Sequence, residues 1–191
     1  INNQAIEVSS GITILQAARQ VGIDIPTLCF LEGKDPLGAC RVCIVEIKGA
    51  RNLVASCSTP VGEGMVIYTN NKRVREARKL VVELLLSEHN GDCQCCDRSE
   101  DCELKALAHD LGIKEVTYEG KKIEKMIDDS SPALIRDSGK CIKCRRCVTV
   151  CNQIQKVGAL FPQNRGYHTL IGPAFALKLE DVPCVQCGQC A

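Results

Sequence analysis

The chain has 191 residues, a formal net charge of +1 and fifteen cysteines, but only three Phe, three Tyr and no Trp. A near-neutral charge does not indicate a nucleic-acid or membrane-surface partner, and the apolar runs are shorter than the roughly 20 residues of a membrane span, so we expect no membrane insertion. An odd number of cysteines at dense C-x2-C spacing favours metal ligation over disulfides, and we expect a reducing, cytoplasmic location without a signal segment.

The first seventy residues predict short strands around one helix. Thr13 followed three residues later by Gln16 forms a capping-box pattern, and Gly22 is a helix stop signal. A helix is therefore expected between Thr13 and Gly22. Apolar residues bounded by turn residues predict strands over residues 6–8, 42–47, 53–56 and 65–68.

Four cysteines in this stretch have the spacing C-x10-C-x2-C-x13-C: Cys29, Cys40, Cys43 and Cys57. Gly38 leaves room for the backbone to approach a metal group closely. The order of strand, helix and ligand loop resembles a plant-type ferredoxin, a β-grasp sheet with a 2Fe–2S cluster, although the usual spacing begins C-x4-C-x2-C. The variant spacing resembles the N-terminal 2Fe–2S domain shared by FeFe-hydrogenases and the large iron–sulfur subunit of NADH-quinone oxidoreductases. The alternative is four unrelated buried cysteines.

A long helix is predicted from about residue 72 to about residue 88, with Asn70 or Asn71 as its N-cap. Its expected apolar stripe comprises Val74, Ala77, Val81, Leu84 and Leu85. His89 follows on the same face, and the next two residues, Asn90-Gly91, end the helix.

After this helix, the spacing H-x3-C-x2-C-x5-C predicts a second metal site: His89, Cys93, Cys96 and Cys102. A neutral imidazole in place of a thiolate removes negative charge and tends to raise the potential of a cluster. The signature resembles the 4Fe–4S site with one histidine and three cysteine ligands in the same two families. Zinc held by three cysteines and one histidine is the alternative. Cys95, between the ligands, is interpreted as a free thiol that points away from them.

Beyond these ligands, an amphipathic helix is expected to stop at Gly112, with His109 in solvent. Residues 114–129 are highly charged and predict a linker that could contain a strand at 115–118.

The last third contains a run C-x2-C-x2-C-x3-C and then a second triplet: Cys141, Cys144, Cys147, Cys151, Cys184, Cys187 and Cys190. The run resembles that of a bacterial two-cluster ferredoxin, in which the fourth cysteine ligates the other cluster. Structural zinc usually takes its ligands as two separated pairs, so a zinc ribbon is the weaker alternative. Basic residues beside the ligands could stabilise a reduced cluster, form a solvated rim or dock an acidic partner: Lys140, Lys143, Arg145 and Arg146.

Three stretches, residues 164–169, 171–175 and 183–190, look like the accessory-cluster region of FeFe-hydrogenases. Those proteins carry a 2Fe–2S domain, a domain with one histidine and three cysteine ligands and a two-cluster domain before the catalytic domain, and the resemblance covers essentially the whole chain. It implies one 4Fe–4S cluster held by Cys151, Cys184, Cys187 and Cys190. It implies another held by Cys141, Cys144 and Cys147, with a fourth cysteine expected about four residues after Cys190, outside this sequence. His168 is interpreted as a loop residue.

We therefore expect an α+β chain of three small modules. Residues 1–71 would form the plant-type ferredoxin-like β-grasp domain, and residues 72–130 a small helical domain with the histidine-ligated cluster and a linker. Residues 131–191 would form a bacterial two-cluster ferredoxin-like domain, truncated at its C-terminal end. The expected cofactors are one 2Fe–2S cluster and three 4Fe–4S clusters.

No catalytic residue is expected within the chain, because no Gly-rich phosphate loop or nucleophile constellation is present in the sequence. The resemblance implies an electron-transfer relay in the catalytic subunit of a multimeric NAD(P)-linked or electron-bifurcating FeFe-hydrogenase, with the hydrogen-activating H-cluster beyond residue 191. It implies a flavoprotein NAD(H)-binding subunit, a small 2Fe–2S subunit and possible exchange with ferredoxin as partners.

Two other readings of the chain stay open. It could be the equivalent module of an NAD-dependent formate dehydrogenase, which shares the two-run layout, or of an NADH-quinone oxidoreductase large subunit. It could also be a stand-alone ferredoxin-like carrier or a structural zinc protein.

Overall fold

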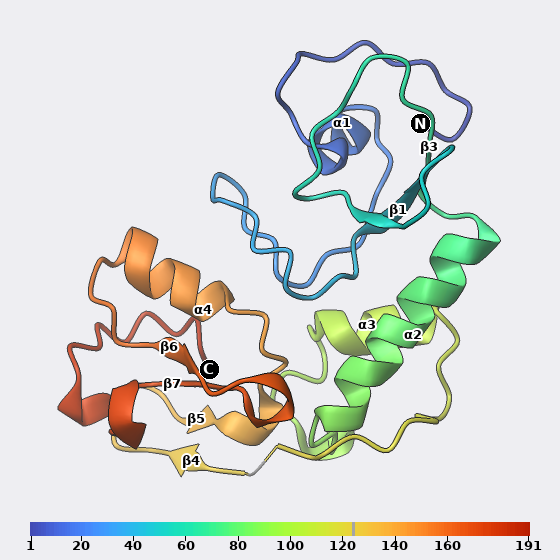
Figure 1. The fold of residues 1–191 in the computed structure, drawn as a ribbon. Helices are drawn as coiled ribbons and strands as arrows, with labels where there is room; N and C mark the ends of the chain where they lie inside the picture. The colour runs from blue at the N-terminus through green and yellow to red at the C-terminus, as the bar shows by residue number, and fades with distance from the viewer. Residues whose placement is uncertain (124) are drawn as a thin grey trace. The chain divides into compact units, whose positions relative to one another are not determined.

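The computed structural model describes residues 1–123 and 125–191, which form two compact units (Figure 1). The first unit comprises Ile1–Glu83 and Arg98–Val116, and the second comprises Leu84–Asp97 and Thr117–Ala191. Both contain short helices and strands joined by long loops, so the expected mixture of α and β structure is confirmed. No helix in the described part of the chain is long and apolar enough to cross a membrane.

The first unit is built on a helix and a three-stranded antiparallel sheet. The elements are α1 (Ile14–Gln20), β1 (Ile44–Ile47), β2 (Val54–Ala55) and β3 (Ile67–Tyr68). The strand order is β2-β1-β3, with β1 in the centre. These strands coincide with three of the four predicted ones, although each is shorter than expected.

The predicted capping box at the start of α1 is confirmed. The backbone N–H of Thr13 donates to Gln16 Oε1 at 2.9 Å, and the Gln16 N–H donates to Thr13 Oγ1 at 3.3 Å. Gly22 follows the helix with a φ of +73°, which only glycine adopts easily. α1 contributes four fully buried residues to a core that also contains two cysteines: Ile14, Leu15, Ala17, Ala18, Cys43 and Cys57.

The strand predicted over residues 6–8 is wrong, because that segment contains no strand. The residues before it take the position at the edge of β3 instead: the Asn2 N–H donates to the Ile67 carbonyl at 2.8 Å. The Asn2 side chain also donates to Thr69 Oγ1 at 2.7 Å and accepts the Thr69 N–H at 2.9 Å. Side-chain hydrogen bonds of this kind compete with a regular ladder.

The long helix α2 (Lys72–Glu88) has the predicted bounds, and Asn71 Oδ1 caps it by accepting the Val74 N–H at 3.0 Å. Its buried face differs from the predicted stripe. Val74, Arg78 and Val82 are buried at a spacing of four residues, whereas Leu84 is 44% exposed. Apolar periodicity could not predict this face because its central residue is charged.

The remaining helix of the first unit, α3 (Glu103–Asp110), buries Leu104 and Leu107, and His109 is exposed as predicted. Residues 115–118 contain no strand.

The second unit contains two short antiparallel strand pairs, the helix α4 (Arg146–Thr149) and several 3-10 turns. β4 (Ile127–Asp128) pairs with β5 (Arg136–Asp137), and β6 (Phe161–Gln163) pairs with β7 (Leu170–Gly172). The helix α4 continues into a π-helical turn, Val150–Ile154. The core of this unit is small and includes a cysteine: Cys151, Ala159, Leu160 and Leu179.

The capping box provides a test of the first unit. Thr13→Ala removes the side-chain acceptor for the Gln16 N–H, so the free energy of unfolding should fall by about 1 kcal/mol. Thr13→Ser keeps the hydroxyl and should stay within a few tenths of a kcal/mol of the unaltered chain. Anaerobic urea unfolding followed by circular dichroism measures both, and equal losses in the two variants would contradict a capping role.

Candidate metal centres

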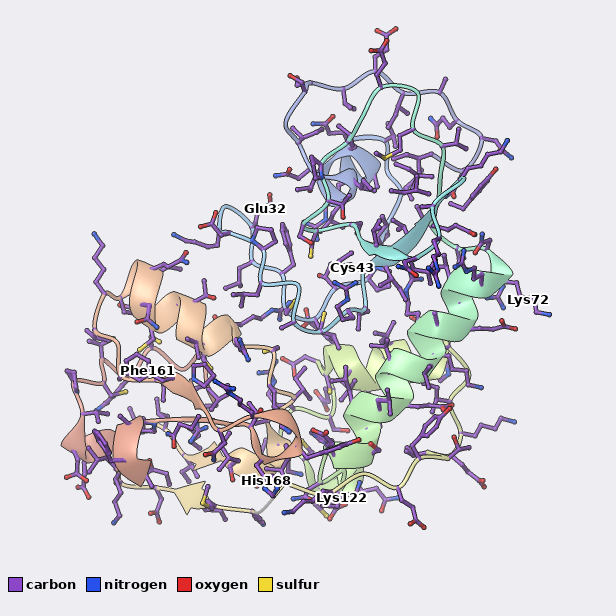
Figure 2. The ribbon with its side chains drawn as sticks, viewed as in Figure 1. Glu32, Cys43, Lys72, Lys122, Phe161 and His168 are labelled. Atoms are coloured by element: carbon purple, nitrogen blue, oxygen red, sulfur yellow. The ribbon has the colours of Figure 1, made fainter. Side chains whose placement is uncertain are left out.

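The four cysteines of the predicted 2Fe–2S site are all buried, with 1–6% of each residue exposed. Cys29 lies in the loop after α1, Cys40 and Cys43 lie in the loop that leads into β1, and Cys57 follows β2. Figure 2 labels Cys43, just before β1. The Ser56 N–H donates to the Cys43 carbonyl at 3.1 Å, which ties two of these segments together. The strand pairing therefore brings together segments that are far apart in the sequence. Among the described residues, no group of three or more His, Cys, Asp or Glu side chains is placed to hold a metal ion, so this ligand set stays a prediction from the spacing.

The thiols of this site shift one another's pKa values in pairs. Cys40 donates to Cys29 and lowers the pKa of Cys29 to about 6, against an opposing effect of burial. Cys57 likewise donates to Cys43 and lowers the pKa of Cys43 to about 6. The pKa of each donor is raised, because its proton is held in the hydrogen bond and its thiolate would be buried. Without metal, each pair therefore keeps one proton and readily releases the other.

The backbone of the ligand loop takes a conformation that is costly for most residues. Arg41, directly after Cys40, has a φ of +57°, and Gly38 has a φ of +59°. A Cβ on Gly38 would meet only Ser58 Oγ, at 3.9 Å. Glycine at position 38 therefore relieves backbone strain that another residue would carry, and crowding by other protein atoms plays no part.

The two cysteine triplets of the second unit share one backbone conformation. Lys143 and Arg145 have positive φ in the first triplet, and Gln186 and Gly188 have positive φ at the corresponding positions of the second. The N–H groups of Lys143 and Gln186 donate, each at 3.4 Å, to the sulfur of the first cysteine in their triplet, Cys141 and Cys184. Left-handed residues in such loops turn successive N–H groups toward an anion. The same loop conformation thus occurs twice, at residues 141–147 and 184–190.

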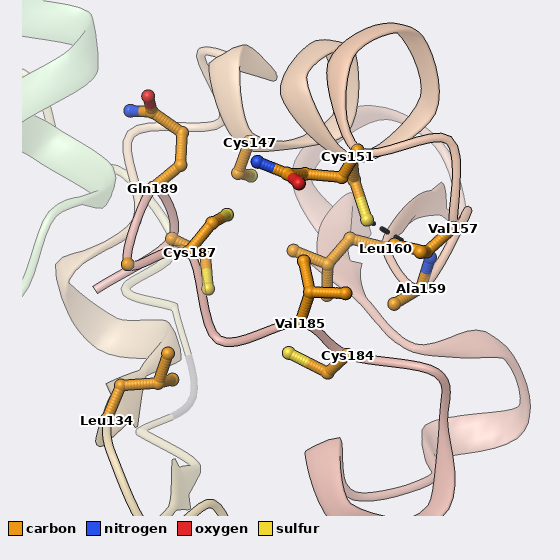
Figure 3. Close-up of a pocket in the computed structure, with 13 residues that line it drawn as sticks. Leu134, Cys147, Cys151, Val157, Ala159, Leu160, Cys184, Val185, Cys187 and Gln189 are labelled. Atoms are coloured by element: carbon orange, nitrogen blue, oxygen red, sulfur yellow. Dashed lines mark hydrogen bonds between the residues drawn. The ribbon is translucent and has the colours of Figure 1, made fainter.

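Five of the seven cysteines in these runs line one apolar pocket (Figure 3): Cys147, Cys151, Cys184, Cys187 and Cys190. Its wall includes Leu134, Val157 and Leu160, which keep the sulfurs in surroundings of low polarity. The Ala159 N–H donates to Cys151 Sγ at 3.1 Å. The four cysteines predicted to hold one 4Fe–4S cluster therefore face the same space, together with Cys147 from the other predicted set.

Burial keeps two of these thiols protonated in the absence of metal. Burial, followed by repulsion from Cys141, Cys144 and Cys190, raises the pKa of Cys147 to about 12. Burial also raises the pKa of Cys190, although Arg136 opposes the shift. Metal binding has to displace these protons, so it depends on pH.

His89 is half-buried and has the character of a metal-binding imidazole. Burial lowers its pKa, although a hydrogen bond with the Lys140 backbone opposes the shift, so the ring is neutral at pH 7. Its Nδ1 is buried and has no hydrogen-bond partner in the described part of the chain. A ligating histidine commonly has one ring nitrogen bonded to the backbone and the other free for the metal.

The end of α2 beside His89 is firmly anchored within the second unit. Lys122 Nζ donates to the His89 carbonyl at 2.8 Å (Figure 2), and the Asn90 N–H donates to the Gly139 carbonyl at 3.1 Å. Glu88 pairs with Lys143 at 2.6 Å, and their side chains are only 23% and 16% exposed. Lys143 of the ligand loop thus forms a partly buried ion pair with α2, and the alternative of a solvated rim is wrong for this residue.

The three cysteines expected to join His89 are divided between the two units. Cys93 and Cys96 belong to the second unit, whereas Cys102 belongs to the first, where its sulfur accepts the Lys105 N–H at 3.4 Å. This ligand set stays a prediction from the sequence spacing. Cys95 is exposed.

Arg78 is a residue near the first site that sequence reasoning missed. It is 4% exposed, and its guanidinium donates to three backbone carbonyls: Val42 at 2.9 Å, Ile44 at 3.0 Å and Thr69 at 3.2 Å. An arginine midway between two valines at a spacing of four was the available signal, but it looked like an interruption of the apolar stripe.

Comparisons with known proteins identify two iron–sulfur binding regions in the chain. Residues 1–72 match the 2Fe-2S iron–sulfur cluster binding domain, and residues 78–117 match the NADH-ubiquinone oxidoreductase-G iron–sulfur binding region. A 2Fe–2S domain and a 4Fe–4S binding region are therefore present.

Among curated proteins, the NADP-reducing hydrogenase subunit HndD of Solidesulfovibrio fructosivorans is 47% identical over 195 residues, which cover all of this chain and 33% of that protein. An NADH-quinone oxidoreductase subunit of the G type from Rhizobium meliloti is 36% identical over 192 residues, which cover all of this chain and 22% of that protein. The chain thus spans about a third or less of the length of these relatives.

Among solved structures, a chain of an NAD+-reducing [NiFe]-hydrogenase in the H2-reduced state superimposes with a TM-score of 0.88 at 30% identity. The match covers 96% of this chain and 77% of that chain. The predicted resemblance to the iron–sulfur region of hydrogenase and NADH-quinone oxidoreductase subunits is confirmed.

The thiol pairs of the first site make a pH titration informative. In the metal-free chain, two thiols should become thiolates as the pH rises through about 6. Cys40→Ala removes the donor to Cys29, so one of these two should return toward the ordinary pKa of 9.0. Anaerobic ultraviolet absorbance of thiolate measures the change, and Cys95→Ala is the control that should leave the low-pH component intact. Absence of that component in the unaltered chain would contradict the pairing.

Proposed function

We propose that this chain, which belongs to the family of iron–sulfur subunits found in hydrogenases and NADH-quinone oxidoreductases, relays electrons through four iron–sulfur clusters to an FeFe-hydrogenase site elsewhere in the same polypeptide. The observation that carries the proposal is the gathering of thiols in the two units. One unit holds a buried quartet of cysteines, and the other repeats one ligand loop twice beside an apolar pocket.

The proposal assigns four sets of ligands. The 2Fe–2S cluster takes Cys29, Cys40, Cys43 and Cys57, and the first 4Fe–4S cluster takes His89, Cys93, Cys96 and Cys102. The second takes Cys141, Cys144, Cys147 and a further cysteine, and the third takes Cys151, Cys184, Cys187 and Cys190. The corresponding modules are residues 1–71 with a β-grasp fold, residues 72–130, and residues 131–191 with a two-cluster ferredoxin-like fold.

The chemistry of the donors fits these groups. Iron–sulfur clusters accept and release single electrons at potentials set by charge, hydrogen bonds and solvent exposure. In this chain, the thiolates hold the iron, and N–H groups from left-handed loop residues donate to the sulfurs. The apolar wall around Cys151 limits access of water, and the neutral His89 ring adds no negative charge.

The partners follow from the names of the relatives. HndD is named as a subunit of an NADP-reducing hydrogenase, and the similar solved chain comes from an NAD+-reducing one. We therefore propose exchange of electrons with a flavoprotein NAD(P)H-binding subunit and a small 2Fe–2S subunit, and with ferredoxin as a further partner.

A second candidate is a relay with the same ligands in an NADH-quinone oxidoreductase. The match of residues 78–117 to the oxidoreductase-G region and the 36% identity to the Rhizobium meliloti protein favour it. Hydrogen-dependent reduction of a viologen dye by the purified full-length protein distinguishes the two. Activity supports the hydrogenase, and absence of hydrogen uptake together with NADH-dependent electron transfer in the complex supports the oxidoreductase.

Metal analysis tests the number of clusters. Anaerobically prepared full-length protein should contain about fourteen iron atoms in these four clusters, in addition to any active-site iron. Iron and acid-labile sulfide are measured together. Zinc in place of iron would contradict the relay.

Replacing the histidine ligand tests the second cluster. His89→Ala should alter or remove one 4Fe–4S signal in the electron paramagnetic resonance (EPR) spectrum of the reduced protein, and His89→Cys should keep a cluster of lower potential because a thiolate adds negative charge. The matched control is His109→Ala, whose side chain is 91% exposed. Spectra unchanged by both His89 variants would exclude His89 as a ligand.

A further inference from the structure

Arg78 carries a positive charge into the core of the first unit without a carboxylate to neutralise it. It lies on α2 between Val74 and Val82, both fully buried. Among the described residues, no carboxylate lies within ion-pair distance of its guanidinium; the Asp24 carboxylate acts on it only as a more distant charge. A buried charge is costly unless it is compensated, and arginine is rarely buried unpaired. The fold therefore retains Arg78 for a reason other than packing.

The contacts of Arg78 point to the ligand loop of the 2Fe–2S site. Its Nε donates to the carbonyl of Val42, which lies between Cys40 and Cys43, and its Nη2 donates to the carbonyl of Ile44, directly after Cys43. A third bond, to the Thr69 carbonyl, fixes the guanidinium against the segment after β3. Burial lowers the pKa of Arg78 and the Cys43 thiolate opposes this shift, but an arginine keeps its charge at neutral pH.

We propose that Arg78 is the built-in counter-charge of the 2Fe–2S cluster, a positioning residue that holds the loop of Cys40 and Cys43 and raises the reduction potential of the cluster. The inference rests on the proposed function only in assigning the four cysteine ligands. Four thiolates make the loaded site an anion. On reduction, one electron from a one-electron donor converts one ferric ion to ferrous, so the site gains one negative charge. A fixed positive charge in surroundings of low dielectric stabilises the reduced site more than the oxidised one.

Arginine keeps its proton at all pH values of interest. Reduction of the cluster is therefore not coupled to protonation or deprotonation of Arg78. The potential of the unaltered protein should therefore be nearly independent of pH as far as Arg78 is concerned. A titratable residue at position 78 would therefore separate the effect of the charge from the effect of the hydrogen bonds.

The first test replaces the charge. Arg78→Met in the full-length holoprotein should lower the ratio of reduced to oxidised 2Fe–2S cluster about tenfold at a fixed potential, equal to a shift of about 59 mV to more negative values. A redox titration followed by the EPR signal of the 2Fe–2S cluster measures it. Arg75→Met removes a charge from the exposed side of the same helix and should leave the potential unchanged. A potential unaltered by Arg78→Met would overturn the proposal.

A second variant keeps the test valid if methionine prevents folding. Arg78→Lys retains a positive charge that can be removed by raising the pH, because lysine can be deprotonated. The ordinary pKa of lysine is about 10.4, and burial lowers it. Its potential should be close to that of the unaltered protein at about pH 7 and should fall relative to it as the pH rises toward about 10. Parallel pH profiles in the two proteins would overturn the counter-charge.

The experiment also separates this inference from the proposed function. Absence of a 2Fe–2S signal in the unaltered protein would contradict the proposed function. A normal signal whose potential does not respond to the Arg78 variants would contradict only the role of Arg78. A loss of thermal stability without any change in potential would show that Arg78 is merely structural, and it would overturn the proposal as well.

Discussion

Thiolates brought close together repel one another, and repulsion is strongest where water is excluded. In the first unit, buried cysteines relieve it by sharing protons, so Cys29 and Cys43 are acidic while their partners keep their protons. In the second, burial and neighbouring sulfurs hold Cys147 and Cys190 in the protonated form. In the proposed clusters, iron would replace these protons as the positive charge, so loading of the clusters would be coupled to stability of the fold.

The backbone of the ligand loops also offsets the repulsion between neighbouring thiolates. Residues with positive φ occur beside the ligands in both units, at Arg41, Lys143 and Gln186 among others. Such angles cost free energy for residues other than glycine, and they persist where the surrounding structure compensates for that cost. The compensation is visible as N–H groups that donate to Cys141 and Cys184. Ionic side chains also hold the loops: Arg78 donates to the Val42 and Ile44 carbonyls in the first unit, and Lys143 pairs with Glu88 in the second.

A relay built in this way separates electron transfer from the chemistry it serves. The family to which the chain belongs includes hydrogenase and NADH-quinone oxidoreductase subunits, and the solved chain that it resembles comes from a [NiFe] enzyme. One iron–sulfur module can serve such different enzymes because its own task is to hold clusters at suitable potentials. Those potentials depend on nearby charges and hydrogen bonds, and in our proposal Arg78 adjusts one of them without altering the ligands.

The amino-acid sequence by itself determined the features that depend on neighbours a few residues away. The cysteine spacing, the capping box at Thr13 and the bounds of α2 all follow from contacts within about one helical turn or one loop. Only the tertiary structure decided which face of α2 is buried, that Arg78 lies in the core, and that Asn2 rather than residues 6–8 bonds to β3. Those outcomes depend on partners far away in the sequence. A buried charge is accepted only where distant carbonyl groups, and in our proposal a cluster, are ready to compensate it.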